Sequence, residues 1–564
     1  MDKRQRTWIF LGIILVVAIF FRFWQFTEFP PGLYPDEAVN GVNGLQAVET
    51  GNYQVFYPDN NGREGLWMNV QGLVSKALGP SPWALRVPSM VIGVLTVLGL
   101  FLLVRELVGD EVALVSAALL ATSFWHTVFS RMAFRAILLP FVLTYLFYFL
   151  VRGLKRGRGS DFVGAGFFFG LGFHTYISYR IVPLLLVALF GVLIWLKRRK
   201  VWQPIFCAPC AVSLMLIVGL VVATPMLLYL IQHPEDWSGR TGGISVWSAQ
   251  SPLKAVLIST AATLGQFNVL GDRNWRHNFP GRPELFWPAG IMMLVGLAIT
   301  FRTAFRIFRA KPAAPPSEET VRPCHSNILV YDSGNGWLVI FGAWLMLGWF
   351  FALMVPAILT REGLPHALRT IGTIPPAYAF AGVGTWLTWK ALRRKVLGGL
   401  EGFLERDPNL EFLRSRLNRI RRWFGVLLAT FLLWVAGSEG VTYFVRWAPH
   451  PRVADAFAAH QTELANYINA AEPDISIYVV VNAPSLNVNG ISLNAQPLVY
   501  LNHGRPNLFF VTPETIGSIP RDLHRAEIIL LDSDRQFLAQ LQRERYPQGK
   551  TKAVSGTIVP LVIP

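Results

Sequence analysis

Two adjacent carboxylates follow the first apolar run of the chain, in the segment Tyr34-Pro35-Asp36-Glu37. Acidic residues here, and Gly51 further on, indicate a helix that begins near residue 36 and ends before the glycine. A carboxylate at a helix start caps the helix and favours its dipole. It can also act as a general base toward a hydroxyl group. Both interpretations stay open, and one residue can serve both.

The same loop continues with Asn61-Gly62-Arg63-Glu64-Gly65. This segment brings a cation and another carboxylate within reach of the first acidic pair. A solvated turn is the alternative interpretation. Further along this loop, a second short helix is expected from Leu66 to Leu78.

Three arginines stand where apolar runs end, namely Arg131, Arg135 and Arg180. Arginine is costly at membrane depth and usually faces a partner or a pathway there, and its guanidinium pairs bidentately with phosphate. These side chains are therefore candidates for binding an anion. The alternative is that they reach toward lipid head groups.

Two later segments gather more polar side chains. Residues 271–281 contain Asp272, Arg273, Arg276 and His277, and residues 360–369 contain His366 and Arg369. Each segment alone is compatible with an ordinary hydrophilic loop. The pair Cys207 and Cys210 has redox spacing, but it lies in an apolar run, which favours a structural role.

These candidates must be positioned by a membrane protein. The chain has 564 residues, of which 52% are hydrophobic and 15% charged, whereas soluble domains carry roughly 25% charged residues. A soluble enzyme is thereby disfavoured. Runs long enough to cross a membrane predict eleven spans, with the first read as a retained helix rather than a signal peptide. They lie near 8–24, 84–104, 111–130, 136–151, 161–178, 181–196, 204–231, 286–301, 337–358, 371–389 and 423–442.

The basic residues predict the orientation of these spans. With the N-terminus inside, the inner segments hold 27 Lys and Arg residues and the outer loops hold 12, as the positive-inside rule requires. The net charge of +17 is thus a topology signal and not a nucleic-acid footprint. Eleven spans place the C-terminus outside, and all the polar clusters above then share the outer face.

The chain divides into two predicted parts. Residues 1–447 form a membrane domain with long outer loops at 25–83 and 232–285, and residues 310–327 resemble a flexible inner linker. Residues 448–564 form a small outer α/β domain, without a nucleophile elbow or phosphate loop, so catalysis is expected elsewhere. Its predicted strands are 475–481, 497–501, 507–511, 527–531 and 557–563, and its predicted helices are 452–470 and 534–545.

Several motifs resemble those of the GT-C glycosyltransferases, specifically the family 39-like group that includes protein O-mannosyltransferases and the aminoarabinose transferases of lipid A. They are the pair Asp36-Glu37, the segment Gly62-Arg-Glu-Gly-Leu-Trp67, Trp83-Ala-Leu-Arg86-Val-Pro88, and His366-Ala-Leu-Arg-Thr-Ile-Gly-Thr-Ile-Pro375. The resemblance is strongest over about the first 200 residues. It implies a mainly α, GT-C-like membrane protein with a small extracytoplasmic α/β domain.

The resemblance also implies a reaction, the inverting transfer of a sugar from a polyprenyl-phosphate donor to an extracytoplasmic hydroxyl. Asp36 matches the first acidic residue of the family's pair and would be the general base, with Glu37 and Glu64 as further catalytic candidates. Arg63 in the motif segment is a candidate for the donor phosphate, where negative charge concentrates. Topology and charge, rather than the motif, add Arg131, Arg135 and Arg180 as candidates. Candidates for binding substrate are Tyr34, Asp272, Arg276, His277, His366 and Arg369.

Members of the family often have an Asp in the second outer loop and a Lys-Gly near the third. This chain departs from that pattern, since it has Arg135 and Tyr179-Arg180 at these places. The sequence holds no metal cluster and the mechanism demands no metal. No cofactor is therefore expected, although a carboxylate-bound divalent ion is left open.

The implied location is the plasma (inner) membrane, with a cytoplasmic N-terminus and an extracytoplasmic C-terminal domain. The expected partners are membrane lipid, the lipid-linked donor, and an acceptor that is protein, lipid or glycan, with no nucleic acid. The alternative function is a polytopic transporter or lipid flippase, which predicts polar residues within the spans and often a repeat between halves. A structural or sensory protein is a third alternative, but it leaves the acidic pair and the arginines without a role.

Overall fold

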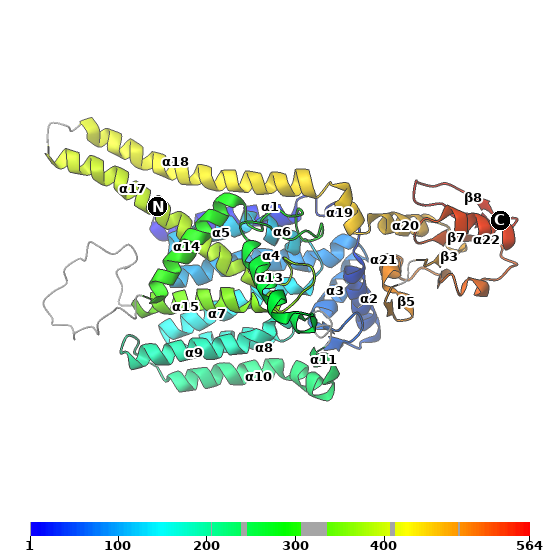
Figure 1. Cartoon of the computed structure of the whole chain (residues 1–564), viewed down its shortest axis with the longest axis horizontal. Helices are drawn as coiled ribbons and strands as arrows, with labels where there is room; N and C mark the ends of the chain where they lie inside the picture. Colours follow the sequence, from blue (N-terminus) through cyan, green and yellow to red (C-terminus); the bar gives the residue numbers. More distant parts are fainter. Residues whose placement is uncertain (1, 205, 239–244, 306–335, 407–411, 483–484) are drawn as a thin grey trace.

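The computed structural model describes residues 2–204, 206–238, 245–305, 336–406, 412–482 and 485–564. Most of these residues are helical, and the long helices lie side by side in one bundle (Figure 1). The bundle helices are α1 (Lys3–Phe23), α4 (Pro82–Leu107), α5 (Asp110–Thr122), α6 (Phe124–Ser130), α7 (Leu138–Arg156), α8 (Gly159–Gly172), α9 (Val182–Arg198), α10 (Ala208–Gln232), α14 (Trp287–Phe305), α15 (Gly336–Ala352), α17 (Ile374–Arg406) and α18 (Phe412–Gly440). The predicted linker at 310–327 lies outside the described residues.

Among the described residues, eight helices are long and apolar enough to cross a membrane. A ninth span results if α5 and α6, which meet at a bend of 60°, count as one. The described residues therefore contain eight or nine candidate spans against the eleven predicted, and the chain is a multi-pass membrane protein as predicted. The run at 161–178 forms α8, which has only 14 residues. The run at 371–389 forms η5 (Ile371–Thr373) and the first part of α17, whose opening prolines and polar residues make it less apolar than a span.

Small residues let the bundle helices approach closely, as is typical of membrane proteins. Where α14 meets α17, a Cβ on Gly296 would lie 1.9 Å from the carbonyl oxygen of Phe380. A Cβ on Gly384 would lie equally close to the carbonyl oxygen of Met292. Only glycine fits at these two positions, so the two backbones are in direct contact.

The loop after α1 contains two helices with the predicted bounds. α2 (Pro35–Thr50) begins at Tyr34, whose backbone N–H donates to the Glu37 carboxylate, and it ends at Gly51 with a φ of +71°. A short antiparallel pair, β1 (Phe56–Tyr57) and β2 (Arg63–Glu64), leads into α3 (Leu66–Leu78). The α2 and α3 backbones touch at Gly44 and Gly72, where an added Cβ would lie 2.1–2.3 Å from the facing carbonyl oxygen. This loop is thus a compact structure on the end of the bundle.

Short elements complete the same end of the bundle. They are η1 (Arg135–Ile137), η2 (Ile177–Ile181), α11 (Glu235–Ser238), η3 (Val246–Ser248), α13 (Pro252–Gly265), α16 (Val355–Ile358) and η5 (Ile371–Thr373). A seven-residue π-helix, η7 (Val441–Trp447), continues α18 toward the C-terminal part.

The C-terminal part contains a five-stranded mixed sheet in the order β6-β3-β7-β9-β8, of which β6, β3 and β7 are parallel. The strands are β3 (Ser476–Val480), β6 (Leu508–Val511), β7 (Ala526–Leu530), β8 (Lys550–Thr551) and β9 (Leu561–Ile563). The helices are α19 (Pro451–Ala456), α20 (Ala459–Ala470), α21 (Gln496–Leu501) and α22 (Arg535–Glu544). A small hairpin formed by β4 (Asn487–Val488) and β5 (Ile491–Ser492) precedes η8 (Leu493–Ala495). A further short helix, η9 (Ile516–Ser518), follows β6.

The predicted strand at 497–501 is wrong, because these residues form α21. Pro497 stands in the first turn of this helix, where its missing N–H is no loss. The buried ring of Tyr500 packs against Gly41 of α2, and its hydroxyl lies 2.7 Å from Ser75 Oγ of α3. α21 therefore docks the C-terminal part onto the loop after α1.

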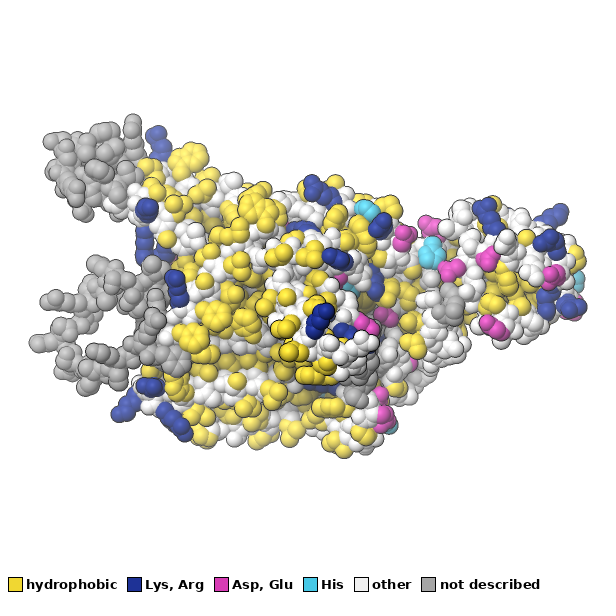
Figure 2. All heavy atoms as spheres, viewed as in Figure 1, with side chains coloured by type: hydrophobic (Ala, Val, Ile, Leu, Met, Phe, Trp, Pro, Cys, Tyr) yellow, Lys and Arg dark blue, Asp and Glu magenta, His cyan; other side chains and the backbone are white. Residues whose placement is uncertain are grey.

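Charge is distributed unevenly along the long axis of the molecule. Figure 2 shows a broad hydrophobic band over the bundle, with Lys and Arg at its edge near the N-terminus. Asp and Glu side chains, together with further Lys and Arg, appear over the C-terminal part and its junction with the bundle.

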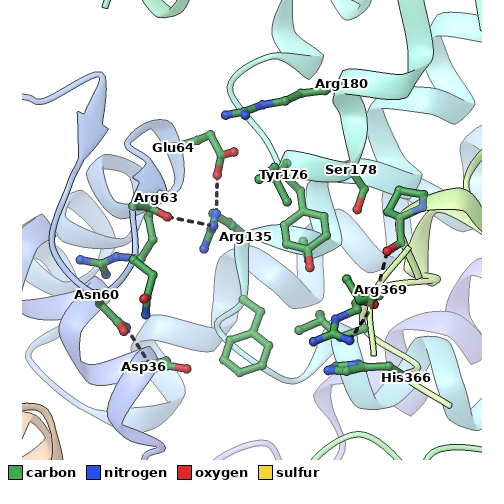
Figure 3. A pocket seen from close by; sticks show the side chains of 18 of the residues that line it. Asp36, Asn60, Arg63, Glu64, Arg135, Tyr176, Ser178, Arg180, His366 and Arg369 are labelled. Carbon is green, nitrogen blue, oxygen red and sulfur yellow. Dashed lines mark hydrogen bonds and ion pairs between the residues drawn. The ribbon is translucent and has the colours of Figure 1, made fainter. Parts of the chain in front are cut away.

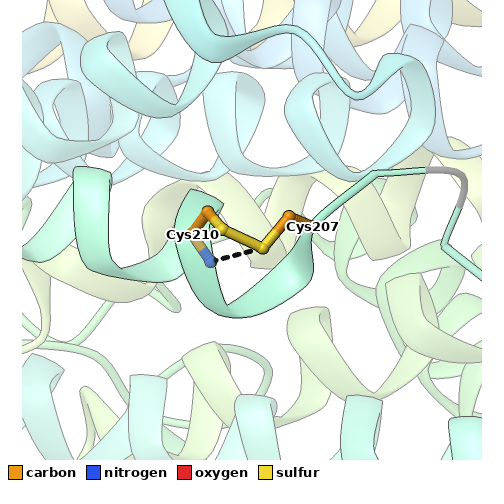
Figure 4. Close-up of a disulfide and its surroundings, with 2 residues drawn as sticks. All are labelled: Cys207 and Cys210. Carbon is orange, nitrogen blue, oxygen red and sulfur yellow. Dashed lines mark hydrogen bonds between the residues drawn. A yellow bond between two sulfur atoms is a disulfide. The ribbon is translucent and has the colours of Figure 1, made fainter.

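Cys207 and Cys210 form a disulfide at the start of α10 (Figure 4). The backbone N–H of Cys210 also donates to the Cys207 sulfur at 3.3 Å. Because the two cysteines are three residues apart, the bond closes one turn and links no distant segments.

Candidate active site

A cavity of about 710 Å³ opens at the end of the bundle that carries α2. Its walls come from the start of α2, from β2, η1, η2 and α16, and from the loops near residues 245, 276 and 366. Ten of the thirteen predicted site residues line it, several of them seen in Figure 3: Tyr34, Asp36, Arg63, Glu64, Arg135, Arg180, Arg276, His277, His366 and Arg369. Glu37, Arg131 and Asp272 do not belong to this lining.

Asp36 stands in the first turn of α2 and is half-buried at the cavity wall. The side-chain amide of Asn60 donates to its Oδ1 at 2.7 Å. This bond holds the carboxylate in place at the cavity wall.

Glu37 has a different environment although it is the next residue. Its side chain is fully buried, and both its oxygens pair with Arg86, with Nε at 3.1 Å from Oε1 and Nη2 at 2.9 Å from Oε2. The backbone N–H of Ala133 also donates to it at 2.6 Å. This carboxylate is held between α2, α4 and the segment after α6, which is a structural position.

Arg63 lines the cavity but is only 3% exposed, and its guanidinium is committed to three side chains. It donates to Asn40 at 2.7 Å, to Asn43 at 2.9 Å and to Asp59 at 2.7 Å. Burial lowers the pKa of Arg63 from its ordinary value, against the opposing charge of Asp59. Arg63 therefore fixes β2 against α2, and its charge reaches the cavity from behind.

Arg135 and Glu64 form an ion pair at the cavity wall, with Nε 2.5 Å from Oε2 (Figure 3). The Arg135 guanidinium also lies 5.7 Å from the centre of the Tyr176 ring. Arg180 donates to the carbonyl of Trp237 and lies over that residue's ring at 4.7 Å. These two guanidiniums come from different helices and face one space.

Arg131 is fully buried and ties down the end of α1. Its guanidinium donates to five backbone carbonyls, those of Phe21, Arg22, Trp24, Gln25 and Phe29. Unpaired carbonyls at a helix C-terminus need donors and favour a cation. This accounts for Arg131 without a ligand.

A second wall contains the later polar segments. Asp272 is buried, and its Oδ2 lies 3.0 Å from His277 Nδ1 and accepts the backbone N–H of Ala367 at 2.9 Å. Burial disfavours the charge of Asp272, but the His277 contact outweighs this and holds its pKa below the usual value. Burial also lowers the pKa of His277, and that of His366 well below its usual range. Both imidazoles are therefore neutral near pH 7.

Two arginines complete this wall. The Arg276 guanidinium lies 3.8 Å above the centre of the Tyr34 ring, which links the later loop to the start of α2. Arg369 donates to Thr360 Oγ1 at 2.8 Å and to the Glu362 carbonyl at 2.5 Å. Both residues thus hold a defined position facing the cavity.

Several lining residues were missed by the sequence reasoning, among them Asn40, Asn60, Tyr176, Ser178, Asp236 and Trp247. Tyr176 and Ser178 stand in the segment that ends at Arg180, and Asn60 stands three residues before Arg63. Their proximity to predicted residues is the only signal that the sequence offers. Residues near 236 and 247 reach the cavity through a long loop whose path the sequence does not reveal.

The lining contains five arginines and three carboxylates, a net formal charge of +2 with neutral histidines. A cavity of this charge, walled partly by low-dielectric protein, attracts anions. It also contains the half-buried carboxylate of Asp36. The arrangement suits a reaction that produces a phosphate-like leaving group beside a hydroxyl that loses a proton.

Comparison with known proteins adds sequence and fold relationships. Residues 67–231 match the family described as dolichyl-phosphate-mannose-protein mannosyltransferase. No curated protein sequence matches the chain. The fold is similar to that of ArnT from Cupriavidus metallidurans bound to undecaprenyl phosphate, with a TM-score of 0.55 and 13% identity over 100% of this chain and 98% of that one.

ArnT in the apo state gives a TM-score of 0.54 at 13% identity, over the same shares of both chains. The archaeal oligosaccharyltransferase AglB from Archaeoglobus fulgidus gives 0.47 at 13% identity, over 99% of this chain and 74% of that one. At such low identity the likeness to ArnT establishes the fold. The resemblance predicted from the sequence is thus confirmed: the chain has the GT-C fold, and over residues 67–231 it matches a family of lipid-phosphate-sugar glycosyltransferases.

Proposed function

We propose that the chain transfers a sugar from a polyprenyl-phosphate donor to a hydroxyl of an extracytoplasmic acceptor, with inversion at the anomeric carbon. The observation that carries the proposal is the single cavity in which Asp36 and five arginines meet. The fold shared with ArnT, whose structure holds undecaprenyl phosphate, supports a lipid-linked donor.

The charge of the cavity fits the change in charge during such a reaction. A lipid-phosphate sugar is a phosphodiester with one negative charge, and the departing lipid phosphate carries about −1.5 to −2 at pH 7. A cavity with a net formal charge of +2 therefore favours the product phosphate over the bound donor. Positive groups aimed at developing charge lower the barrier.

The residues have distinct proposed roles. Asp36 accepts the proton of the acceptor hydroxyl as its oxygen attacks the anomeric carbon and the bond from that carbon to the phosphate oxygen breaks. Arg135 and Arg180 face the cavity from two helices and stabilise the departing phosphate. Glu64 holds Arg135 in position, and Arg63 braces β2 behind them.

The second wall is proposed to receive the other substrate groups. Tyr34, Arg276, His277, His366 and Arg369 all face the cavity, and Asp272 orients His277 from behind. Their mixture of rings and hydrogen-bonding groups suits a sugar or an acceptor.

The proposed orientation places the cavity and the C-terminal part on the outer face. It is supported by Lys and Arg at the edge of the hydrophobic band near the N-terminus, which is the cytoplasmic pattern (Figure 2). The division at residue 448 is likewise proposed, with α21 as the contact that docks the outer part.

The test is a donor panel offered to the purified chain in proteoliposomes. We expect radiolabel from a polyprenyl-phosphate sugar to reach an acceptor, and none from the matching nucleotide sugar. Added polyprenyl phosphate should inhibit, whereas uncharged polyprenol should not, because it lacks the anion that the arginines bind. Movement of lipid or solute across the vesicles with no donor consumed would refute the proposal and support a transporter.

A further inference from the structure

Two histidines and one carboxylate converge at the second wall of the cavity. Asp272, His277 and His366 each offer a ligand atom, and the three atoms lie within 4.8 Å of one another. The Oδ2 atom of Asp272 is 3.0 Å from His277 Nδ1 and 3.7 Å from His366 Nδ1. Both imidazoles thus direct the same kind of nitrogen at one carboxylate oxygen.

Hydrogen bonding alone explains only part of this arrangement. Asp272 accepts from Ala367 N and contacts His277, so it joins the loop after α13 to the segment before η5. The Nδ1 atom of His366, however, is buried and has no hydrogen-bond partner among the described residues. A buried polar atom without a partner calls for an explanation such as an ion.

The geometry points to a divalent metal site of the zinc type, formed by Asp272, His277 and His366. Zn²⁺ prefers imidazole nitrogen and carboxylate oxygen at about 2.0–2.2 Å. Ligands at that distance in tetrahedral geometry are about 3.3 Å apart, which lies between the two distances observed here. Three protein ligands with one open position are the pattern of a zinc site that binds water or substrate.

The open position would face the cavity, because His277 and His366 belong to its lining. In Figure 3, His366 and Asp36 lie on different sides of this space. An ion held here would place a positive charge opposite the carboxylate, where it could bind an oxygen of a phosphate, a sugar or water. The inference goes beyond the expectation from the sequence, which left a carboxylate-bound divalent ion open, and it does not depend on the proposed function.

The surrounding charges limit how tightly the ion binds. Arg276 and Arg369 act on both histidines as nearby positive charges, and Asp272 is the one carboxylate in the triad. Each guanidinium is held away by its own partner, Arg276 by the Tyr34 ring and Arg369 by Thr360. We therefore expect specific binding that a chelator can remove.

The test is metal binding by the full chain in detergent, stripped with a chelator and titrated with Co²⁺. Four-coordinate Co²⁺ absorbs visible light much more strongly than the aqueous ion, so the signal reports the site and not free metal. We expect saturation at one ion per chain, and loss of the signal when Zn²⁺ is added.

His366→Ala is the decisive variant. This substitution leaves every hydrogen bond of Asp272 in place. If the cluster were purely structural, the substitution would therefore not change Co²⁺ binding. Loss of a ligand predicts an affinity about 10- to 100-fold lower or worse, since outer-shell changes alone reach that range. His503→Ala is the matched control, because His503 pairs with Glu49 and is not part of the cavity lining. No saturable binding by the unmodified chain, or equal binding by His366→Ala, would overturn the inference.

Discussion

Glu37→Gln separates the roles of the two adjacent carboxylates. The Glu37 side chain is 0% exposed and pairs through both oxygens with Arg86, which is 1% exposed. The substitution removes the negative charge and leaves the Arg86 cation buried among neutral acceptors, namely the new amide oxygen and the carbonyls of Pro30 and Gly32. Removing one partner of a buried pair costs about 3–5 kcal/mol. We therefore expect a protein of much lower stability.

The assay is thermal unfolding of the purified protein in detergent, followed by tryptophan fluorescence and combined with the transfer rate per folded molecule. The matched control is Glu49→Gln, the same substitution in the last turn of the same helix. Glu49 is 54% exposed and pairs with His503, and exposed pairs contribute about 0–1 kcal/mol. We expect Glu37→Gln to lower the unfolding temperature by several degrees and the control to leave it nearly unchanged.

The folded fraction of Glu37→Gln should still transfer sugar, because Asp36 and the cavity arginines are unaltered. A variant as stable as the unmodified chain, but without transfer activity, would refute the structural assignment. In that case Glu37 would be the base and its contact with Arg86 would not describe its role.

Three further predictions concern the cavity and the contacts that support it. Arg135→Ala removes a guanidinium from the cavity wall and leaves Glu64 without its partner. We expect the transfer rate, measured as kcat at saturating donor, to fall about 10²- to 10³-fold. A rate within about threefold of normal would exclude Arg135 from phosphate stabilisation. Gly44→Ala places a Cβ 2.3 Å from the Met68 carbonyl oxygen. It should destabilise the protein by about 1–3 kcal/mol, which thermal unfolding would show as a lower unfolding temperature. An unchanged unfolding temperature would mean that α2 and α3 are not packed this closely. Tyr500→Phe removes the hydrogen bond to Ser75 and should lower the stability of this contact by about 1 kcal/mol. Limited proteolysis would detect the change as faster release of the C-terminal part. Unchanged cleavage would show that this bond does not hold the two parts together.

The sequence predicts the local structure around Asp36 well because its signals are local. The acidic pair and Gly51 mark the two ends of α2, and α3 occupies Leu66–Leu78 as predicted. The cavity collects most of the predicted residues because they all occur where helices end at the same face. Residues at such helix ends lie close together even when they are far apart in the sequence.

What the sequence could not predict depends on distant partners. Glu37 is structural because Arg86, 49 residues away, reaches it, and Arg131 is structural because the end of α1 offers it five carbonyls. Residues 497–501 have strand-forming side chains but fold as α21, where Tyr500 packs against α2. The span count differs for another reason, since α8 has only 14 residues and α17 opens with prolines and polar residues, so neither meets the length and composition of a candidate span.

The most direct test of the central claim is the single-turnover rate of Asp36→Asn with saturating polyprenyl-phosphate sugar. Asp522→Asn, at an exposed position in the C-terminal part, is the matched control. We predict that Asp36→Asn binds donor normally, because the cavity becomes more positive, but transfers it about 10²- to 10⁴-fold more slowly, while the control keeps the full rate. A near-normal rate in Asp36→Asn would contradict the account and assign the proton to another group.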